Sequence, residues 1–113
     1  MRIEDAVRIR HMVDAADTAC RFMAGRQRAS LDADQMLLFA VVRAMEVLGE
    51  AAGKVSDETR SVAPGIPWSS IVGMRNRLIH GYFDIDTEIV WKTVVDELPG
   101  LARQLRATLN SAI

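Results

Sequence analysis

The sequence has 113 residues, the size of a single domain, taken here as residues 1–113. Half of the residues are apolar and 26% are charged, a composition that excludes a disordered chain. The net charge of −1 gives no sign of nucleic-acid binding by charge alone. One cysteine, Cys20, excludes an internal disulfide. No Cys/His cluster has metal-ligand spacing, and no membrane-length apolar run or signal peptide is found, so a cytoplasmic protein without cofactors is expected. Asp84 and Asp86 are spaced like metal ligands, but a turn and a helix cap explain them.

Helical periodicity begins near the first residue. Apolar side chains recur at steps of three and four at Ile9, Val13, Ala16, Cys20 and Met23. This pattern predicts a first helix over residues 3–23, in which Cys20 is a small core residue. Residues 24–30 are expected to form a connection.

A second helix is predicted to begin at Asp32, because Asp32 and Gln35 have the spacing of a capping box. Its apolar face consists of Leu38, Val41, Met45, Leu48 and Ala52. Two such helices joined by a short link predict an antiparallel hairpin. Gly49 and Gly53 lie within this helix, where glycine is unfavourable, and either the close approach of another helix or simple tolerance explains them.

The third predicted helix runs from Pro67 to His80 and stops near Gly81, after an irregular stretch in which Ser56 caps one short turn. Pro67 suits the first position of a helix, where no backbone N–H bond is lost.

Asp84 or Asp86 is expected to cap a fourth helix, which Pro99 should kink or break into two segments. Its apolar face consists of Val90, Val94, Leu98, Leu101 and Leu105. No strand alternation is found. The predicted fold is all-α, an up-and-down bundle of four to five helices.

The segment from Met74 to Tyr82 carries two arginines, an asparagine, a histidine and the only tyrosine. A histidine such as His80 exchanges protons near neutral pH, and an arginine such as Arg75 binds a phosphate through two hydrogen bonds. Together they suffice for metal-independent RNA cleavage. The histidine would deprotonate a ribose 2′-OH, and the arginine would stabilise the charge on the phosphate.

The spacing of the two residues complicates this reading. Residues five apart on an ideal helix lie about 140° apart around the axis and about 7.5 Å along it. Arg75 and His80 would then not share a face, whereas Asn76 and His80 would. Either the helix loosens at His80, or two copies of the helix face each other across a twofold axis. We favour the second, a homodimer.

The segment resembles the Arg-x4-His-x-Tyr motif of HepT-like toxins in the HEPN superfamily, with Arg75, His80 and Tyr82 at its three positions. The surrounding residues 71–76 and 81–86 also resemble the family, as do residues 48–52, 90–94 and 97–99. The resemblance covers nearly the whole chain.

The resemblance implies a HEPN-type homodimer whose protomers share a cleft, with Arg75 and His80 as the catalytic pair and Asn76 as a polar helper. It implies an RNA substrate and, as partner, a minimal nucleotidyltransferase antitoxin. That antitoxin would silence the toxin by transferring AMP from ATP to Tyr82, placing a bulky anion beside the catalytic histidine.

Other readings of the same residues remain open. Arg75 could pair with Glu46 or Glu50 in a structural ion network, His80 could close the end of a helix, and Arg77 reads as a solvated charge. At the level of the whole protein, the alternative is a non-catalytic HEPN subunit that binds a nucleotide or presents a substrate to its nucleotidyltransferase. A third option is a helical scaffold without activity.

Overall fold

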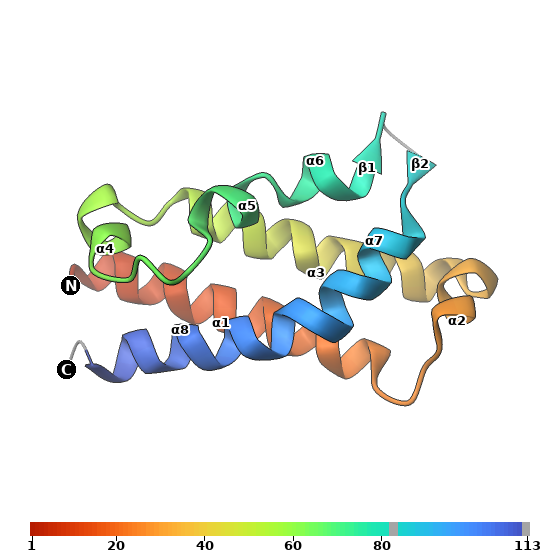
Figure 1. Ribbon diagram of the computed structural model, residues 1–113, viewed down its shortest axis with the longest axis horizontal. Coiled ribbons are helices and arrows are strands. Elements are labelled where there is room, and N and C mark those ends of the chain that lie inside the picture. Colours follow the sequence, from red (N-terminus) through yellow and green to blue (C-terminus); the bar gives the residue numbers. More distant parts are fainter. Residues whose placement is uncertain (82–83, 112–113) are drawn as a thin grey trace.

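A computed structural model describes residues 1–81 and 84–111 of the chain (Figure 1). Helices make up most of this structure, with one short strand pair beside them, so the prediction of an all-α fold is confirmed. In chain order, the elements are α1 (Ile3–Met23), α2 (Arg28–Ala33), α3 (Gln35–Gly53), α4 (Asp57–Ser61), α5 (Trp68–Val72), α6 (Met74–Leu78), β1 (Ile79–His80), β2 (Asp84–Ile85), α7 (Thr87–Lys92), the π-helical segment η1 (Thr93–Glu97) and α8 (Leu98–Ser111).

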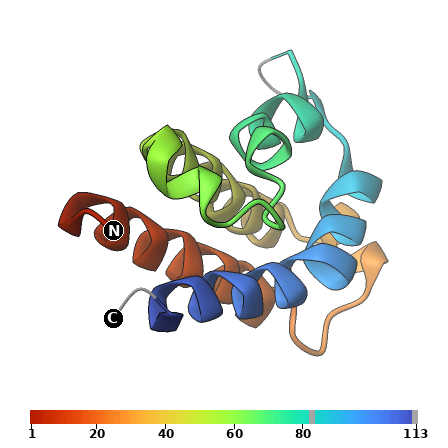
Figure 2. The same cartoon turned by 60° about the vertical axis from the view of Figure 1, so that its left-hand side comes forward.

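The long helices form an up-and-down bundle. Helices α1 and α3 run antiparallel, and α8 packs along α1 (Figure 1). Helix α4 lies at the end of the bundle where α1 begins, and the short helices α5 and α6 then lie along α3 and bring the chain back toward the end that carries α2 (Figures 1 and 2). The predicted first helix matches α1 at both ends, and the predicted antiparallel hairpin is α1 with α3.

The core lies between α1, α3 and α8 and follows the predicted apolar faces closely. All five residues of the predicted last face are buried, and on α3 only Leu38 departs from the prediction: it is half-buried, and Leu37 is buried in its place. The largest fully buried side chains include Ile9, Met12, Met45, Leu48, Leu98 and Leu105. Within residues 1–81 and 84–111, no helix is both long and apolar enough to cross a membrane.

The predicted start of the second helix is wrong. Asp34, not Asp32, caps α3, and its side chain accepts a hydrogen bond from the backbone N–H of Leu37 at 3.1 Å. Asp32 lies inside α2, whose first residues, 28–30, fall in the predicted connection, and it pairs there with Arg28 at 2.8 Å. Arg28 also pairs with Glu88 of α7. Because Arg28 reaches Glu88 only when α2 packs against α7, the short helix depends in part on tertiary contacts.

The predicted third helix is interrupted and ends early. It consists of α5 and α6, separated at Gly73, and Pro67 is the residue before α5 rather than its first residue. The helix ends at Leu78, because Ile79 is extended and pairs with Ile85 across an antiparallel strand pair that the sequence did not predict. The ladder is extended by the backbone N–H of Asp86, which donates to the carbonyl of Leu78 at 2.8 Å.

Pro99 changes the type of helix without interrupting it. The segment before it winds as a π-helix, η1, and the chain continues directly into α8. Since proline has no N–H, the carbonyl of Val94 lacks the donor that a continued π pattern would supply. The Cys20 thiol contacts that carbonyl at 3.9 Å. Burial, with a smaller contribution from Asp17, raises the pKa of Cys20, as befits a packed rather than a nucleophilic thiol.

Asp5 is a buried carboxylate that joins α1 to the capping turn of α4. It accepts hydrogen bonds from the backbone N–H and hydroxyl of Ser56 and from the hydroxyl of Thr59, at 3.0, 2.6 and 2.6 Å. Ser56 in turn caps α4, as predicted. Burial raises the pKa of Asp5, but these hydrogen bonds outweigh burial, and the pKa lies below its ordinary value.

Asp5→Ala should lower the free energy of unfolding by about 2–4 kcal/mol, because it leaves buried donors without an acceptor. Since the pKa is lowered in the folded state, the carboxylate stabilises the protein above the unfolded pKa, and this stabilisation is lost as the pH falls through the folded pKa. The stability difference between the parent protein and Asp5→Asn should therefore shrink below about pH 4. Urea unfolding at several pH values measures it. Glu4→Ala, at an exposed neighbouring position, should show neither effect.

Candidate active site

Helix α6 presents Arg75 and Asn76 to solvent because its two ends are anchored in the core. Met74 and Leu78 lie four residues apart on one side of this helix, and both are buried. Arg75 and Asn76 lie between them and are exposed. The short helix is thus an amphipathic support, fixed by its apolar face, for polar side chains on its outer face.

Gly49 of α3 allows α5 and α6 to lie close to α3. A Cβ atom at Gly49 would come within 2.9 Å of the backbone oxygen of Ile71 and 3.4 Å of the Cβ of Met74. Of the two explanations considered for Gly49, the close approach of another helix is therefore the correct one. At Gly53 an added Cβ would meet nothing within 4 Å, so no close neighbour explains that glycine.

Gly49→Ala should destabilise the protein by about 1–3 kcal/mol, because the backbone oxygen of Ile71 can yield only if α5 moves. Gly53→Ala is the matched variant on the same helix, and it should be neutral or stabilising by up to about 1 kcal/mol. Thermal or urea unfolding of both proteins provides the comparison. Equal behaviour of the two variants would contradict close packing at Gly49.

Arg75 pairs with α3. Its Nε donates to Oε2 of Glu46 at 3.2 Å, and Glu46 is largely covered whereas 59% of the Arg75 side chain is exposed. A neighbouring pair, Arg43 with Glu50, lies on the same stripe of α3 at 3.3 Å. Arg75, Glu46 and Glu50 help to line a hollow of about 270 Å³ between α3 and α5–α6. One guanidinium edge is therefore held by Glu46, and the rest of the side chain faces solvent.

His80 is positioned by backbone pairing, not by a helix. It lies on β1 opposite Asp84, and Gly81 follows in a left-handed conformation with φ of +81°. Its Nε2 lies 3.7 Å from Oδ2 of Asp86, while Oδ1 of Asp86 accepts the N–H of Ile89 and caps α7. Asp86 thus lies beside the histidine ring and fixes the start of α7, whereas Asp84, the other candidate cap, belongs to β2.

The structure places Arg75 and His80 on consecutive elements, each with 59% of its side chain exposed and each beside its own carboxylate. His80 does not line the hollow at Arg75. The expected pairing of Asn76 and His80 on one helical face is wrong, because the helix ends at Leu78. His80 is likewise not a helix cap. Tyr82, the expected modification site, lies outside the described residues.

Two neighbours of the motif differ from their predicted roles. Arg77 is half-buried and donates to Ser70 and to Glu97, at 3.1 and 3.2 Å, so the prediction of a solvated charge is wrong. Asp86 was expected only as a cap, and nothing in its spacing from His80 indicates the second role. Only the antiparallel pairing of residues 79–80 with 84–85 returns Asp86 to the histidine.

Comparison with known proteins identifies the family. Residues 12–108 match the family model described as ribonuclease HepT-like. The chain belongs to the HepT-like ribonuclease family. A Thermococcus cleftensis protein named "Probable ribonuclease HepT" is 41% identical over 68 residues, which are 60% of this chain and 62% of that protein. The resemblance inferred from residues 71–86 is confirmed, and with it the HEPN-type fold.

Two further relatives of the HepT-like family carry RNase in their names. One, from Methanocaldococcus jannaschii, is 39% identical over 64% of this chain and 66% of its own length. The other, from Caldanaerobacter subterraneus subsp. tengcongensis, is 39% identical over 68% of this chain and 69% of its own length. The alignments thus span only about two thirds of these relatives. No solved structure matches the chain.

Proposed function

We propose that the protein is a metal-independent endoribonuclease in which His80 and Arg75 act on one phosphodiester. The observation that carries this proposal is the pair itself. A histidine and an arginine of the HepT-like motif are both open to solvent on adjoining elements, and each lies beside a carboxylate. One can move a proton and the other can hold a phosphate.

In the proposed reaction, His80 takes the proton of a ribose 2′-OH, and the 2′ oxygen bonds to the adjacent phosphorus. The bond from phosphorus to the 5′ oxygen breaks, and that oxygen takes up a proton from the histidinium or from water. Arg75 stabilises the negative charge on the phosphate oxygens as they crowd the phosphorus. The products are a 2′,3′-cyclic phosphate and a 5′-OH. DNA lacks the attacking group.

A homodimer would complete this site. Within the part of the chain that the structure describes, His80 is not among the residues that line the hollow at Arg75, so a second copy would supply the missing wall. Met36 and Phe39 support this, because they lie on the same stripe of α3 as Glu46 and are 84% and 54% exposed. Val72, also exposed, lines the hollow at Arg75.

Phe39→Glu should therefore shift the protein from dimer to monomer in light scattering and lower cleavage in parallel.

The activity is tested with purified protein, an RNA and its all-2′-deoxy counterpart in the presence of EDTA. We expect cleavage of the RNA only, with cyclic phosphate ends detected by mass spectrometry. Loss of cleavage with chelator would contradict the metal-free mechanism. RNA binding without cleavage would instead favour the non-catalytic binding subunit.

The same family resemblance motivates a regulatory proposal. We expect the protein to be the toxin of a cytoplasmic toxin–antitoxin pair, and a small nucleotidyltransferase to transfer AMP from ATP to the hydroxyl of Tyr82, two residues after His80. The added phosphate would repel substrate phosphate from the site. Incubation with that enzyme and ATP should add the mass of AMP and stop cleavage. An equal mass gain in Tyr82→Phe would remove Tyr82 as the acceptor.

A further inference from the structure

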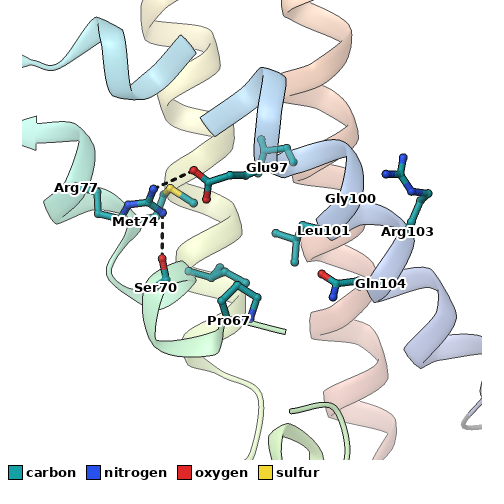
Figure 3. Close-up of a pocket in the computed structure, with 11 residues that line it drawn as sticks. Pro67, Ser70, Met74, Arg77, Glu97, Gly100, Leu101, Arg103 and Gln104 are labelled. Carbon is teal, nitrogen blue, oxygen red and sulfur yellow. Dashed lines mark hydrogen bonds and ion pairs between the residues drawn. The ribbon is translucent and has the colours of Figure 1, made fainter. Parts of the chain in front are cut away.

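A second hollow lies on the other side of α6, between α5–α6 and α8 (Figure 3). Its volume is about 490 Å³, within the range of small-ligand sites. Arg77 borders this hollow, whereas Arg75, two residues earlier on the same short helix, borders the hollow against α3. We call it the α6–α8 pocket.

The floor of the α6–α8 pocket is apolar. Ile71, Met74, Leu98 and Leu101 line it, and all four are buried. Such a floor suits a flat, weakly polar ring, which loses water on entering and contacts aliphatic carbons and the Met74 thioether.

Arg77 is fixed at one edge of the pocket. Its two terminal nitrogens donate to Ser70 on α5 and Glu97 on η1, so the plane of the guanidinium is held from both sides (Figure 3). The pair with Glu97 leaves little net charge at this edge. Arg77 instead presents a rigid planar guanidinium at this edge, and guanidinium planes of this kind stack on nucleobases.

Arg103 supplies the charge. It lies on the α8 side of the pocket, with one terminal nitrogen 3.6 Å from the position a Cβ would occupy on Gly100. Within residues 1–81 and 84–111, Arg103 forms no ion pair. With Arg77 neutralised by Glu97, the pocket carries one unmatched positive charge, which favours an anionic group.

We propose that the α6–α8 pocket binds a nucleotide, with its base between the apolar floor and the Arg77 guanidinium and its phosphate at Arg103. The nucleotide is either a free nucleoside monophosphate or one unit of an RNA strand, since both offer the same base and phosphate. The proposal goes beyond the cleavage reaction and does not require Arg75 or His80 to be catalytic.

Calorimetry with the full chain tests the pocket, using AMP, adenosine and inorganic phosphate as separate probes. AMP should bind, while adenosine and phosphate bind much more weakly because each makes only half of the contacts. Arg103→Gln should weaken AMP binding about tenfold, the loss of a charge-assisted hydrogen bond. Arg106→Gln removes the same charge from the same helix outside the pocket and should leave AMP affinity within about twofold. The proposal is overturned if both variants weaken AMP binding equally. It is also overturned if AMP does not bind at millimolar concentration and Arg103→Gln has no effect on RNA binding.

A tetranucleotide of RNA, titrated into His80→Ala so that it stays intact, separates the two sources. If Arg103→Gln weakens the oligonucleotide more than AMP, the pocket serves the substrate strand. If it weakens AMP alone, the pocket serves a free nucleotide. Backbone amide shifts in NMR should be confined to the segments that line the pocket, around residues 67–77 and 97–104. Shifts centred on Glu46 and Arg75 would place the ligand in the other hollow and contradict the assignment. Failure of cleavage in the parent protein would leave these binding results intact.

Discussion

His80→Ala should reduce RNA cleavage by about a thousandfold while leaving the fold intact. Removal of a general base lowers rates by about 10²–10⁴-fold, and no other imidazole lies on α6 or the strand pair. The side chain is exposed, so its loss creates no cavity and should change the unfolding free energy little. Rates from a fluorescent RNA substrate, together with circular dichroism and thermal unfolding, measure both effects. Where expression of the parent protein arrests cell growth, as proposed for a toxin, expression of the variant should not.

The chain offers a matched control, because it contains one other histidine. His11 is also exposed, but it lies on α1 away from the strand pair. His11→Ala should cleave RNA at the parental rate. If both variants cleave RNA at the parental rate, or if both lose cleavage equally, His80 is not the base.

Arg75→Ala is the second large effect, with cleavage expected to fall by about 10²–10³-fold, the cost of removing a donor to the developing phosphate charge. The opposing explanation is structural, through the ion pair with Glu46. A pair whose guanidinium is this open to solvent contributes only about 0–1 kcal/mol to stability, far less than the expected effect on rate. The two explanations therefore predict different ratios of lost activity to lost stability.

Two further variants separate them. Arg75→Lys keeps a charge without the planar fork and should recover only part of the activity. Arg2→Ala removes an arginine from another exposed ion pair, with Glu58 at 3.4 Å, and should leave cleavage unchanged. A loss of activity in Arg75→Ala that merely tracks its thermal destabilisation would favour the structural role.

The long helices could be predicted because their apolar periodicity continues over many turns. Residues 3–23 were placed at both ends, and the face from Val90 to Leu105 is buried as expected. The short elements could not be predicted, since their residues are held by distant partners. Arg28 needs Glu88, and Ile79 needs Ile85, before α2 or the strand pair is favourable.

The candidate site divides in the same way. Arg75 and His80 were proposed from their residue types together with the resemblance to the HepT-like motif. Glu46 was one of two carboxylates, with Glu50, considered as a partner of Arg75. The proximity of Asp86 to His80 was not predicted, because it results from a strand pair too short to leave a periodic pattern in the sequence. The ion pair between Arg77 and Glu97 was also not predicted, because it depends on how α6 and η1 pack in the folded chain.

The buried carboxylate of Asp5 also bears on how the domain should be delimited. The family match begins at residue 12, yet α1 begins at Ile3. Asp5, in the unmatched part, accepts hydrogen bonds from Ser56 and Thr59, which lie 51 and 54 positions later in the sequence. A chain shortened to the matched limits would start in mid-helix and leave Ser56 and Thr59 facing an empty position. Such a fragment should be prone to aggregation even though it keeps every residue of the motif.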